Sequence, residues 1–408
     1  MKTVLLRLTG FTVFPLLSLV TPLVLLPIIS GIVGGQGIAS VISGQAIGVF
    51  AATLVTWGWS VDGPVAVARA TTDVERAAVY LRSIRDRLVL SAIAFPIACL
   101  LAALIAVPGF KSAAAAMALA SGLAGLSPAW FCIGLGDPRL LAYYDTVPRF
   151  AATLVAAPLL YLAHELWIYT ALLIVASIVS LAAFHRRFTP GGSWFPTSWR
   201  QSFSGIWGQR HTAGISMAGS VYASTPAPIA TATTSISASA SLSTADTLYR
   251  FGIFTVVALG NALQSWTIEP GQASRSRRHS LAIGSHVALG LVGLGILVVA
   301  GPFASELLFA GQARATTELC FYYGVAFFFL SASTPLMRNI LIPAGRHSLV
   351  LRWTLISAVA GVVFMLVAGL SGNAPGIALG MALSEAVLCI SLLPSAVREL
   401  RRAEAVKP

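Results

Sequence analysis

The chain has 408 residues, of which 57% are hydrophobic and only 10% are charged. Soluble domains carry about 25% charged residues, so this composition excludes an ordinary water-soluble globule. It predicts an all-α protein that crosses a membrane many times. The formal net charge of +12 does not indicate nucleic-acid binding, because the basic residues lie between apolar segments. The four cysteines show no Cys-x-x-Cys spacing, so we expect no disulfide, no metal site and no cofactor.

Twelve apolar segments follow one another along the chain, each long enough for a spanning helix. Those in the first half are 10–33, 38–59, 88–107, 113–135, 141–163 and 167–184. Those in the second half are 213–231, 244–266, 281–301, 317–339, 349–370 and 375–396. The longest outer loop, 302–316, has about 15 residues, so no outer loop could fold as a catalytic domain. We therefore expect a protein that is not an enzyme and that functions among its helices.

Lysine and arginine are distributed unevenly between the two sides of the predicted membrane. With a cytoplasmic N-terminus, 22 of the 26 basic residues fall in cytoplasmic segments or at their helix edges. Only Lys111 and Arg314 lie on the outer side. This asymmetry follows the positive-inside rule, so both termini are predicted to be cytoplasmic. Membrane lipids with anionic headgroups are expected neighbours of the basic side.

The two halves share features at a fixed offset of 207 residues. Residues 59–62 (Trp-Ser-Val-Asp) match 266–269 (Trp-Thr-Ile-Glu), and Ser127-Pro128 matches Thr334-Pro335. Six helices per half place both halves in the membrane in the same sense, which predicts a parallel repeat with substrate held between two lobes. The predicted divisions are an N-terminal lobe (1–184), a basic cytoplasmic linker (185–212), a C-terminal lobe (213–397) and a cytoplasmic tail (398–408).

Two Asp–Arg pairs with the same spacing lie at membrane depth. Asp145 precedes Arg149 by four residues in the fifth segment, and Asp246 precedes Arg250 by four near the outer end of the eighth. In each pair the aspartate and the arginine could simply neutralise each other on their own helix. The side chains of Asp246 and Arg250 could also reach the outer surface. Charged side chains inside a membrane usually face a protein interior or an aqueous cavity, and in a cavity the planar guanidinium of arginine suits a phosphate group. All four residues are therefore candidate substrate contacts.

Two further features of the second half are candidates for function. Glu385 lies near the middle of the twelfth segment with no cation within a turn, so it is either protonated and inert or a coupling residue that titrates during transport. Residues 216–247 contain 14 serines and threonines, with Pro226 and Pro228 inside the seventh segment. Such a stretch permits close helix packing, and it equally suits a bent helix whose hydroxyls line a wet cavity.

Five short stretches carry a resemblance to a known family. They are 128–135 (Pro-Ala-Trp-Phe-Cys-Ile-Gly-Leu), 147–150 (Val-Pro-Arg-Phe), 245–250 with Glu269-Pro270, 307–311 (Leu-Leu-Phe-Ala-Gly) and Gly345-Arg346. With twelve spans in two lobes, the chain resembles the polysaccharide-transport branch, including O-antigen flippases, of the multidrug/oligosaccharidyl-lipid/polysaccharide exporter superfamily. The resemblance implies a MATE-like fold and alternating access of two lobes.

The resemblance also implies a substrate and a location. It implies a flippase of the bacterial cytoplasmic membrane that moves a polyprenyl-pyrophosphate-linked oligosaccharide for surface polysaccharide biosynthesis. Arg149 and Arg250 match places where the family often has cavity arginine or lysine, so they are expected to contact the headgroup. A polysaccharide polymerase or export complex is an implied further partner.

Three alternatives remain open. A cation-coupled multidrug antiporter of the same superfamily would place carboxylates deep in the first lobe, but the first, second and fourth segments contain none in their apolar cores. A lipid II flippase usually has helices beyond twelve. A membrane-embedded glycosyltransferase or polymerase needs longer outer loops than this chain has.

Overall fold

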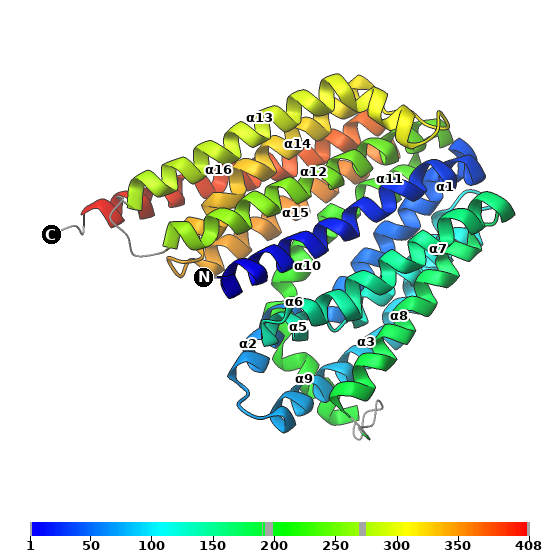
Figure 1. Ribbon diagram of the computed structural model, residues 1–408. Coiled ribbons are helices and arrows are strands. Elements are labelled where there is room, and N and C mark those ends of the chain that lie inside the picture. The colour runs from blue at the N-terminus through cyan, green and yellow to red at the C-terminus, as the bar shows by residue number, and fades with distance from the viewer. Residues whose placement is uncertain (1, 190, 192–198, 269–274, 406–408) are drawn as a thin grey trace. The chain divides into compact units, whose positions relative to one another are not determined.

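The computed structural model describes the backbone of residues 2–189, 191, 199–268 and 275–405 (Figure 1). Within these ranges the described side chains exclude 2–24, 199–201, 211, 215, 261–262, 264–268, 275–276 and 403–405. The described backbone contains helices and no strands. Helix runs through all twelve expected segments, and nine described helical stretches are long and apolar enough to cross a membrane. Glu269 and Pro270 of the repeat and the family motif lie outside the described residues.

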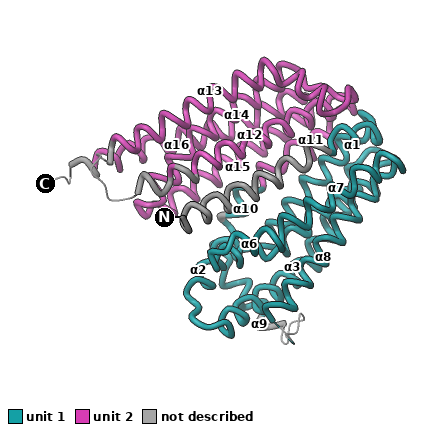
Figure 2. The backbone as a smooth tube through the Cα atoms, in the orientation of Figure 1, with its two compact units in different colours: residues 1–220 teal, residues 221–408 magenta. Residues whose placement is uncertain are grey.

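The chain divides into two compact units, residues 1–220 and 221–408 (Figure 2). The helices that begin in unit 1 are α1 (Lys2–Thr56), α2 (Trp59–Arg69), α3 (Asp73–Ile105), α4 (Lys111–Gly122), the 3₁₀ turn η1 (Leu123–Leu126), α5 (Ala129–Leu135), α6 (Pro138–Leu141), the π turn η2 (Ala142–Thr146), α7 (Val147–Ala163), α8 (Trp167–Phe188), α9 (Trp199–Gly208) and α10 (Arg210–Ser224). The boundary between the units falls inside α10.

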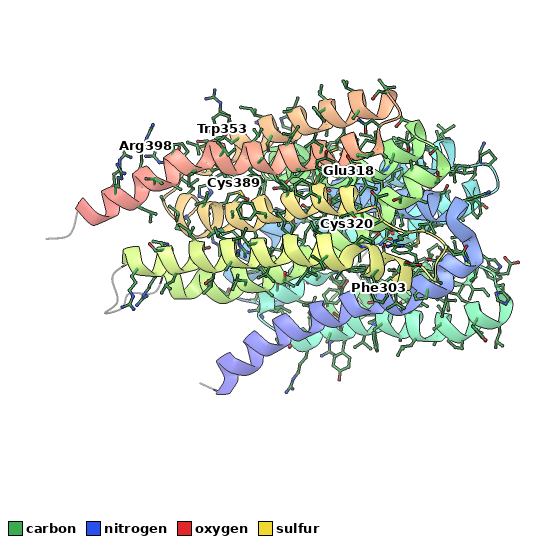
Figure 3. The ribbon with its side chains drawn as sticks, turned by 90° about the horizontal axis from the view of Figure 1, so that it is seen from above. Phe303, Glu318, Cys320, Trp353, Cys389 and Arg398 are labelled. Carbon is green, nitrogen blue, oxygen red and sulfur yellow. The ribbon has the colours of Figure 1, made fainter. Side chains whose placement is uncertain are left out.

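Unit 2 is built from fewer and longer helices. They are α11 (Pro226–Thr233), α12 (Ile236–Ile268), α13 (Arg275–Leu308), α14 (Thr317–Pro335), the π turn η3 (Leu336–Leu341), α15 (His347–Leu370) and α16 (Ala374–Ala405). Figure 3 shows Arg398 and Trp353 toward one end of this unit and Glu318 and Phe303 toward the other. The arginine-rich end of α16 and the start of α14 therefore lie at opposite ends of the unit.

Small residues set the packing of α1 against α4. Gly34 has a φ of 61° inside α1 and separates its two halves. Beyond this kink, a Cβ atom on Gly44 would collide with the carbonyl oxygen of Ala114, and one on Gly48 would collide with that of Ala118. Such glycine and alanine pairs at four-residue spacing let two membrane helices approach closely.

Local signals also explain where several helices begin and break. Thr72 and Glu75 form a reciprocal capping box at the start of α3. Prolines interrupt three of the expected spans, at Pro128, Pro148 and Pro226, because proline cannot donate the helical hydrogen bond. These interruptions position the polar side chains described below.

Large apolar side chains cover the outside of both units. Val299 is 83% exposed, Leu370 80% and Leu162 76%. In a soluble protein such a surface would be an aggregation hazard, whereas in a bilayer it faces lipid tails of matching polarity. The chain is therefore a multi-pass membrane protein, as the composition predicts.

Candidate functional site

In unit 1, Asp145 and Arg149 form an ion pair on one helix. Asp145 lies in the π turn η2 and Arg149 in the first turn of α7, with Arg149 Nη2 3.2 Å from Asp145 Oδ1. The side chains of Asp145 and Arg149 remain 20% and 34% exposed respectively. The carboxylate is thus neutralised within its own helix, while part of the guanidinium remains accessible.

Pro148 explains why a π turn forms at this point. It has no N–H to donate to the carbonyl of Tyr144, and Val147 N donates instead to Ala142 O, five residues back. The Ser180 hydroxyl of α8 donates to Tyr144 O at 2.5 Å and so satisfies the carbonyl that proline leaves free. π turns are frequent at functional sites, and this one presents Asp145 toward α5 and α8.

A small cavity adjoins the ion pair. The Ser127 hydroxyl donates to Asp145 Oδ1 at 2.5 Å, which brings the break between η1 and α5 next to η2. Ser127, Asp145, Arg149, Ser177 and Ser180 contribute polar groups to a cavity of about 40 Å³. That volume holds roughly three water molecules. The arrangement allows a hydrated polar site in unit 1, at the position of one sequence-predicted pair.

Arg87 stabilises the break in the fourth span. The Ala129 N–H bonds to Ser127 Oγ, so Gly125 O loses its usual helical donor. Arg87 Nη1 donates to Gly125 O at 3.1 Å and to Ser127 O at 2.9 Å, and the whole residue is 0% exposed. Its guanidinium carbon also lies 5.6 Å from the centre of the Trp130 ring. The apolar segments 38–59 and 88–107 predict Arg87 at the end of the cytoplasmic loop between them, whereas the structure buries it fourteen residues into α3.

In unit 2, Asp246 and Arg250 form a tighter pair than their counterparts. Arg250 Nε lies 2.7 Å from Asp246 Oδ2, and Asp246 is 0% exposed. Arg250 Nη2 also donates to the backbone carbonyl of Ala223, in the last turn of α10. The eighth helix begins at Ile236, eight residues before its expected start, so the pair lies inside the helix rather than near its outer end. The surface-reaching alternative is therefore wrong for Asp246.

Three tyrosines link this pair to Glu385. Glu385 on α16 is 1% exposed, and the Tyr222 hydroxyl of α10 is its hydrogen-bonding neighbour. Tyr249 lies within electrostatic reach of both Glu385 and Asp246, and its ring centre is 5.4 Å from that of Tyr323. Four helices thus bring Asp246, Arg250 and Glu385 into one buried cluster, which we call the tyrosine–carboxylate cluster (Tyr222, Asp246, Tyr249, Arg250, Tyr323 and Glu385).

Several polar atoms of this cluster lack a well-aligned partner among the described residues. They are Oδ1 of Asp246, Oε1 of Glu385 and the hydroxyls of Tyr249 and Tyr323. Buried polar groups without partners are rare and costly, and they often mark functional sites. The cluster therefore has spare capacity to accept or donate a proton or to accept a cation.

The serine- and threonine-rich stretch is bent, and its hydroxyls bond mostly within it. The helix bends at Thr225, between α10 and α11, as one interpretation of the prolines predicted. The described hydroxyls bond mainly to carbonyls of their own helix, including Thr233 to Ile229 O and Thr247 to Ser243 O. Such bonds use up the hydroxyl proton and let helices approach closely. These hydrogen bonds favour the interpretation of close helix packing over that of a cavity-lining face.

The sequence-predicted residues thus fall into two separate groups, one within each unit. Asp145 and Arg149 join Ser127 and the unit 1 cavity, while Asp246, Arg250 and Glu385 join the tyrosines. Sequence reasoning missed Arg87 and the three tyrosines. An arginine at the edge of an apolar segment could have pointed to Arg87, whereas the tyrosines sit in apolar helices and give no local signal.

No protein-family model matches the chain, and no curated protein matches it in sequence. Solved structures do match. The lipid II flippase MurJ, in an inward closed conformation, superimposes with a TM-score of 0.69 and 9% identity over 98% of this chain and 90% of that chain. An inward-facing multidrug resistance MATE family transporter of the MOP superfamily gives a TM-score of 0.65 and 13% identity, covering 96% of each chain.

A third match is a MOP superfamily transporter from Pyrococcus furiosus, with a TM-score of 0.54 and 14% identity over 98% of this chain and 94% of that one. At such low identities the likeness concerns the fold. The chain has the polytopic, all-helical, MATE-like fold of these transporters, so the expected fold class is confirmed.

Proposed function

We propose that this chain is a flippase of the bacterial cytoplasmic membrane that moves a polyprenyl-pyrophosphate-linked oligosaccharide to the outer leaflet. The proposed mechanism is alternating access of lobes 1–184 and 213–397, which the linker 185–212 joins, with both termini cytoplasmic. The MATE-like fold supports a transporter, and the likeness to a lipid II flippase supports a lipid-linked substrate. No residue is proposed as a chemical catalyst.

The observation that carries this proposal is the state of Arg149. Its guanidinium is about one-third exposed, borders a polar cavity, and lies beside a carboxylate that Ser127 also holds. A pyrophosphate could therefore approach the guanidinium without unpairing Asp145 completely. A planar, permanently charged guanidinium suits bidentate binding of phosphate oxygens.

Arg250 and Asp246 take a different part in the proposed mechanism. Arg250 is committed to Asp246 and to the carbonyl of Ala223, so it has fewer donors for a headgroup than Arg149. We assign this pair to holding the kinked seventh helix in unit 2. Glu385, whose carboxylate keeps one unpartnered oxygen, is the proposed coupling residue.

The test is transport of a defined lipid. Full-length protein in liposomes should move a fluorescent polyprenyl-pyrophosphate disaccharide between leaflets, measured by the fraction accessible to an external reductant. Arg149→Ala should reduce the rate, whereas the matched control Arg314→Gln, at an exposed pair with Glu306, should leave it unchanged. Equal transport rates for these two variants would remove Arg149 from the headgroup site.

A second test uses cells. Deletion of the gene should cause a defined lipid-linked oligosaccharide to accumulate on the inner leaflet.

A cation-coupled multidrug antiporter is the second candidate, and the tyrosine–carboxylate cluster is the observation that favours it. Two buried carboxylates beside aromatic rings could bind an organic cation or a coupling ion. If the liposomes moved no lipid but accumulated a fluorescent organic cation against a proton or sodium gradient, this candidate would replace the flippase. A polysaccharide polymerase or export complex remains a proposed partner of the flippase alone.

A further inference from the structure

The short helix α9 has one face packed against unit 1 and one face open. Ser202 is 5% exposed, and a Cβ on Gly205 would lie 3.0 Å from Asp86 Oδ2 of α3. On the other face, Phe203 is 56% and Trp207 69% exposed. Since residues four apart share a helix face, these two aromatic rings form one stripe. We call Phe203 and Trp207 the aromatic stripe.

α9 is held firmly in this orientation. The indole Nε1 of Trp57 donates to the carbonyl of Ile206 at 2.8 Å. Trp57 adopts a φ of 52°, a left-handed conformation that is unfavourable for a side chain of this size. The hydrogen bond from Trp57 holds the backbone of α9 at Ile206, between the two residues of the aromatic stripe.

The segment that carries the stripe has charges of one sign only. The segment 185–211 contains four arginines and no aspartate or glutamate. Arg210 stacks on Trp207, with its guanidinium carbon 5.0 Å from the ring centre, and donates to Trp207 O at 3.0 Å. Arg186 and Arg187 are exposed at the end of α8, and Arg187 lies 5.9 Å from the Phe188 ring. An arginine thus lies over an aromatic ring both at the end of α8 and at the end of α9.

This chemistry matches a lipid headgroup region. α9 has ten residues, too few to cross a bilayer. Tryptophan and arginine prefer the interface, where the ring reaches the acyl boundary and the guanidinium stays among phosphates. An amphipathic helix with such a face lies in the plane of the interface, and basic residues beside it select anionic lipid.

We propose that α9 is an interfacial anchor whose aromatic stripe inserts into the anionic-lipid headgroup layer, with Arg186, Arg187 and Arg210 binding the lipid phosphates. The partner is thus phosphatidylglycerol or another anionic lipid of the same leaflet. The anchor would fix the level of unit 1 in the membrane. This inference does not depend on the transported substrate.

The test is photocrosslinking in lipid nanodiscs. Full-length protein carries p-benzoylphenylalanine at position 203 or 207, and discs contain either phosphatidylglycerol or phosphatidylcholine. The expected result is lipid adducts on the α9 peptide, identified by mass spectrometry, with roughly fivefold enrichment per participating arginine in phosphatidylglycerol. The matched control is the same probe at Val74, which is 79% exposed but stands between Asp73 and Glu75; it should give little adduct.

A second arm tests the charges. Combining Arg186→Gln, Arg187→Gln and Arg210→Gln should abolish the preference for phosphatidylglycerol while leaving some insertion of the aromatic stripe. Because these residues are exposed, folding should be intact, and unchanged thermal unfolding verifies it. Independently, Trp207→Phe should remove part of the tryptophan quenching by brominated phosphatidylglycerol. The proposal would be overturned if the probes at 203 and 207 crosslinked only to protein, or if the probes at 207 and 74 gave equal amounts of lipid adduct.

Discussion

Arg250 of α12 binds the carbonyl of Ala223 in the last turn of α10, while its Nε pairs with Asp246 at 2.7 Å. Pro226 and Pro228 have no N–H, so fewer backbone donors are available at the junction where α10 ends. A cation at a helix C-terminus is also favourable electrostatically. The guanidinium of Arg250 therefore neutralises the buried carboxylate of Asp246 and bonds to the C-terminal end of α10. Both contacts are expected to stabilise the folded protein.

Arg250→Ala should strongly destabilise the protein. The change leaves Asp246 buried and without its counter-ion, which typically costs about 3–5 kcal/mol. The matched control is Arg346→Ala, which breaks an exposed bridge to Glu399 and should leave the stability almost unchanged. Thermal unfolding in detergent measures both. Adding Asp246→Asn to Arg250→Ala should reduce the loss of stability, because it removes the unpaired charge. If the double variant were no more stable than Arg250→Ala, the pairing argument would be wrong.

Arg149→Ala should leave the fold intact and slow transport. Its pair with Asp145 is partly exposed, so the stability cost is small. Losing charge-assisted bonds to a pyrophosphate should reduce lipid transport by about 10- to 100-fold. Arg149→Lys should recover only part of the rate, because an ammonium cannot bind two phosphate oxygens in the same planar geometry. Initial rates in liposomes provide the measurement.

Ser180→Ala should destabilise unit 1 through the carbonyl of Tyr144. Without the hydroxyl this carbonyl loses its donor, at a cost of about 1–3 kcal/mol. Adding Pro148→Ala restores a backbone N–H that can bond to the same carbonyl, so the double variant should be more stable than Ser180→Ala. A double-mutant cycle by thermal unfolding checks the coupling, and strictly additive losses would contradict it.

Glu385→Gln should remove proton dependence from transport without unfolding the protein. The amide keeps the size of the carboxyl and a hydrogen-bonding group for Tyr222, but it cannot change charge. Transport by the wild type should respond to an imposed pH gradient, and transport by the variant should not. Ser384→Ala, at the neighbouring position of α16, serves as the control. An unchanged pH response would exclude Glu385 from coupling.

Gly44→Ala should disturb the contact between α1 and α4. The added methyl group would collide with Ala114 O, a backbone atom that cannot move aside alone, so a loss of about 1–3 kcal/mol is expected. Gly31 lies on the same helix, and a methyl group added there would meet nothing within 4 Å, so Gly31→Ala is the matched control. Comparable unfolding temperatures for both variants would contradict the close-packing interpretation.

The fold was predictable because it depends on apolar length and charge placement, which are properties of the sequence alone. Twelve apolar segments with basic inner edges predict a polytopic helical protein, and helix occupies every one of them. Pro226 and Pro228 also permitted the prediction of a bend in the seventh segment, as one of two interpretations. What local patterns did not predict was the form of each bend: Pro128 breaks its span, whereas Pro335 is followed directly by a π turn.

The candidate sites were predictable only in part. The spacing of Asp145 and Arg149, and of Asp246 and Arg250, was sufficient to expect ion pairs within one helix. The surroundings of Glu385 were not, because Tyr222 and Tyr249 reach it from other helices and are 163 and 136 residues away in the chain. Contacts between distant helices depend on how the bundle packs, which periodicity does not encode.

The position of Arg87 bears on the order in which the chain enters the membrane. Its acceptors, Gly125 O and Ser127 O, are synthesised 38 and 40 residues later. Until they emerge, Arg87 Nη1 lacks both of these acceptors, and we expect the guanidinium to resist leaving the insertion channel for lipid. The third and fourth helices should therefore be released into lipid together, as a hairpin. A nascent chain truncated before Lys111 should remain accessible to a water-soluble thiol reagent at a cysteine placed beside Arg87, and one extended past Leu135 should be protected.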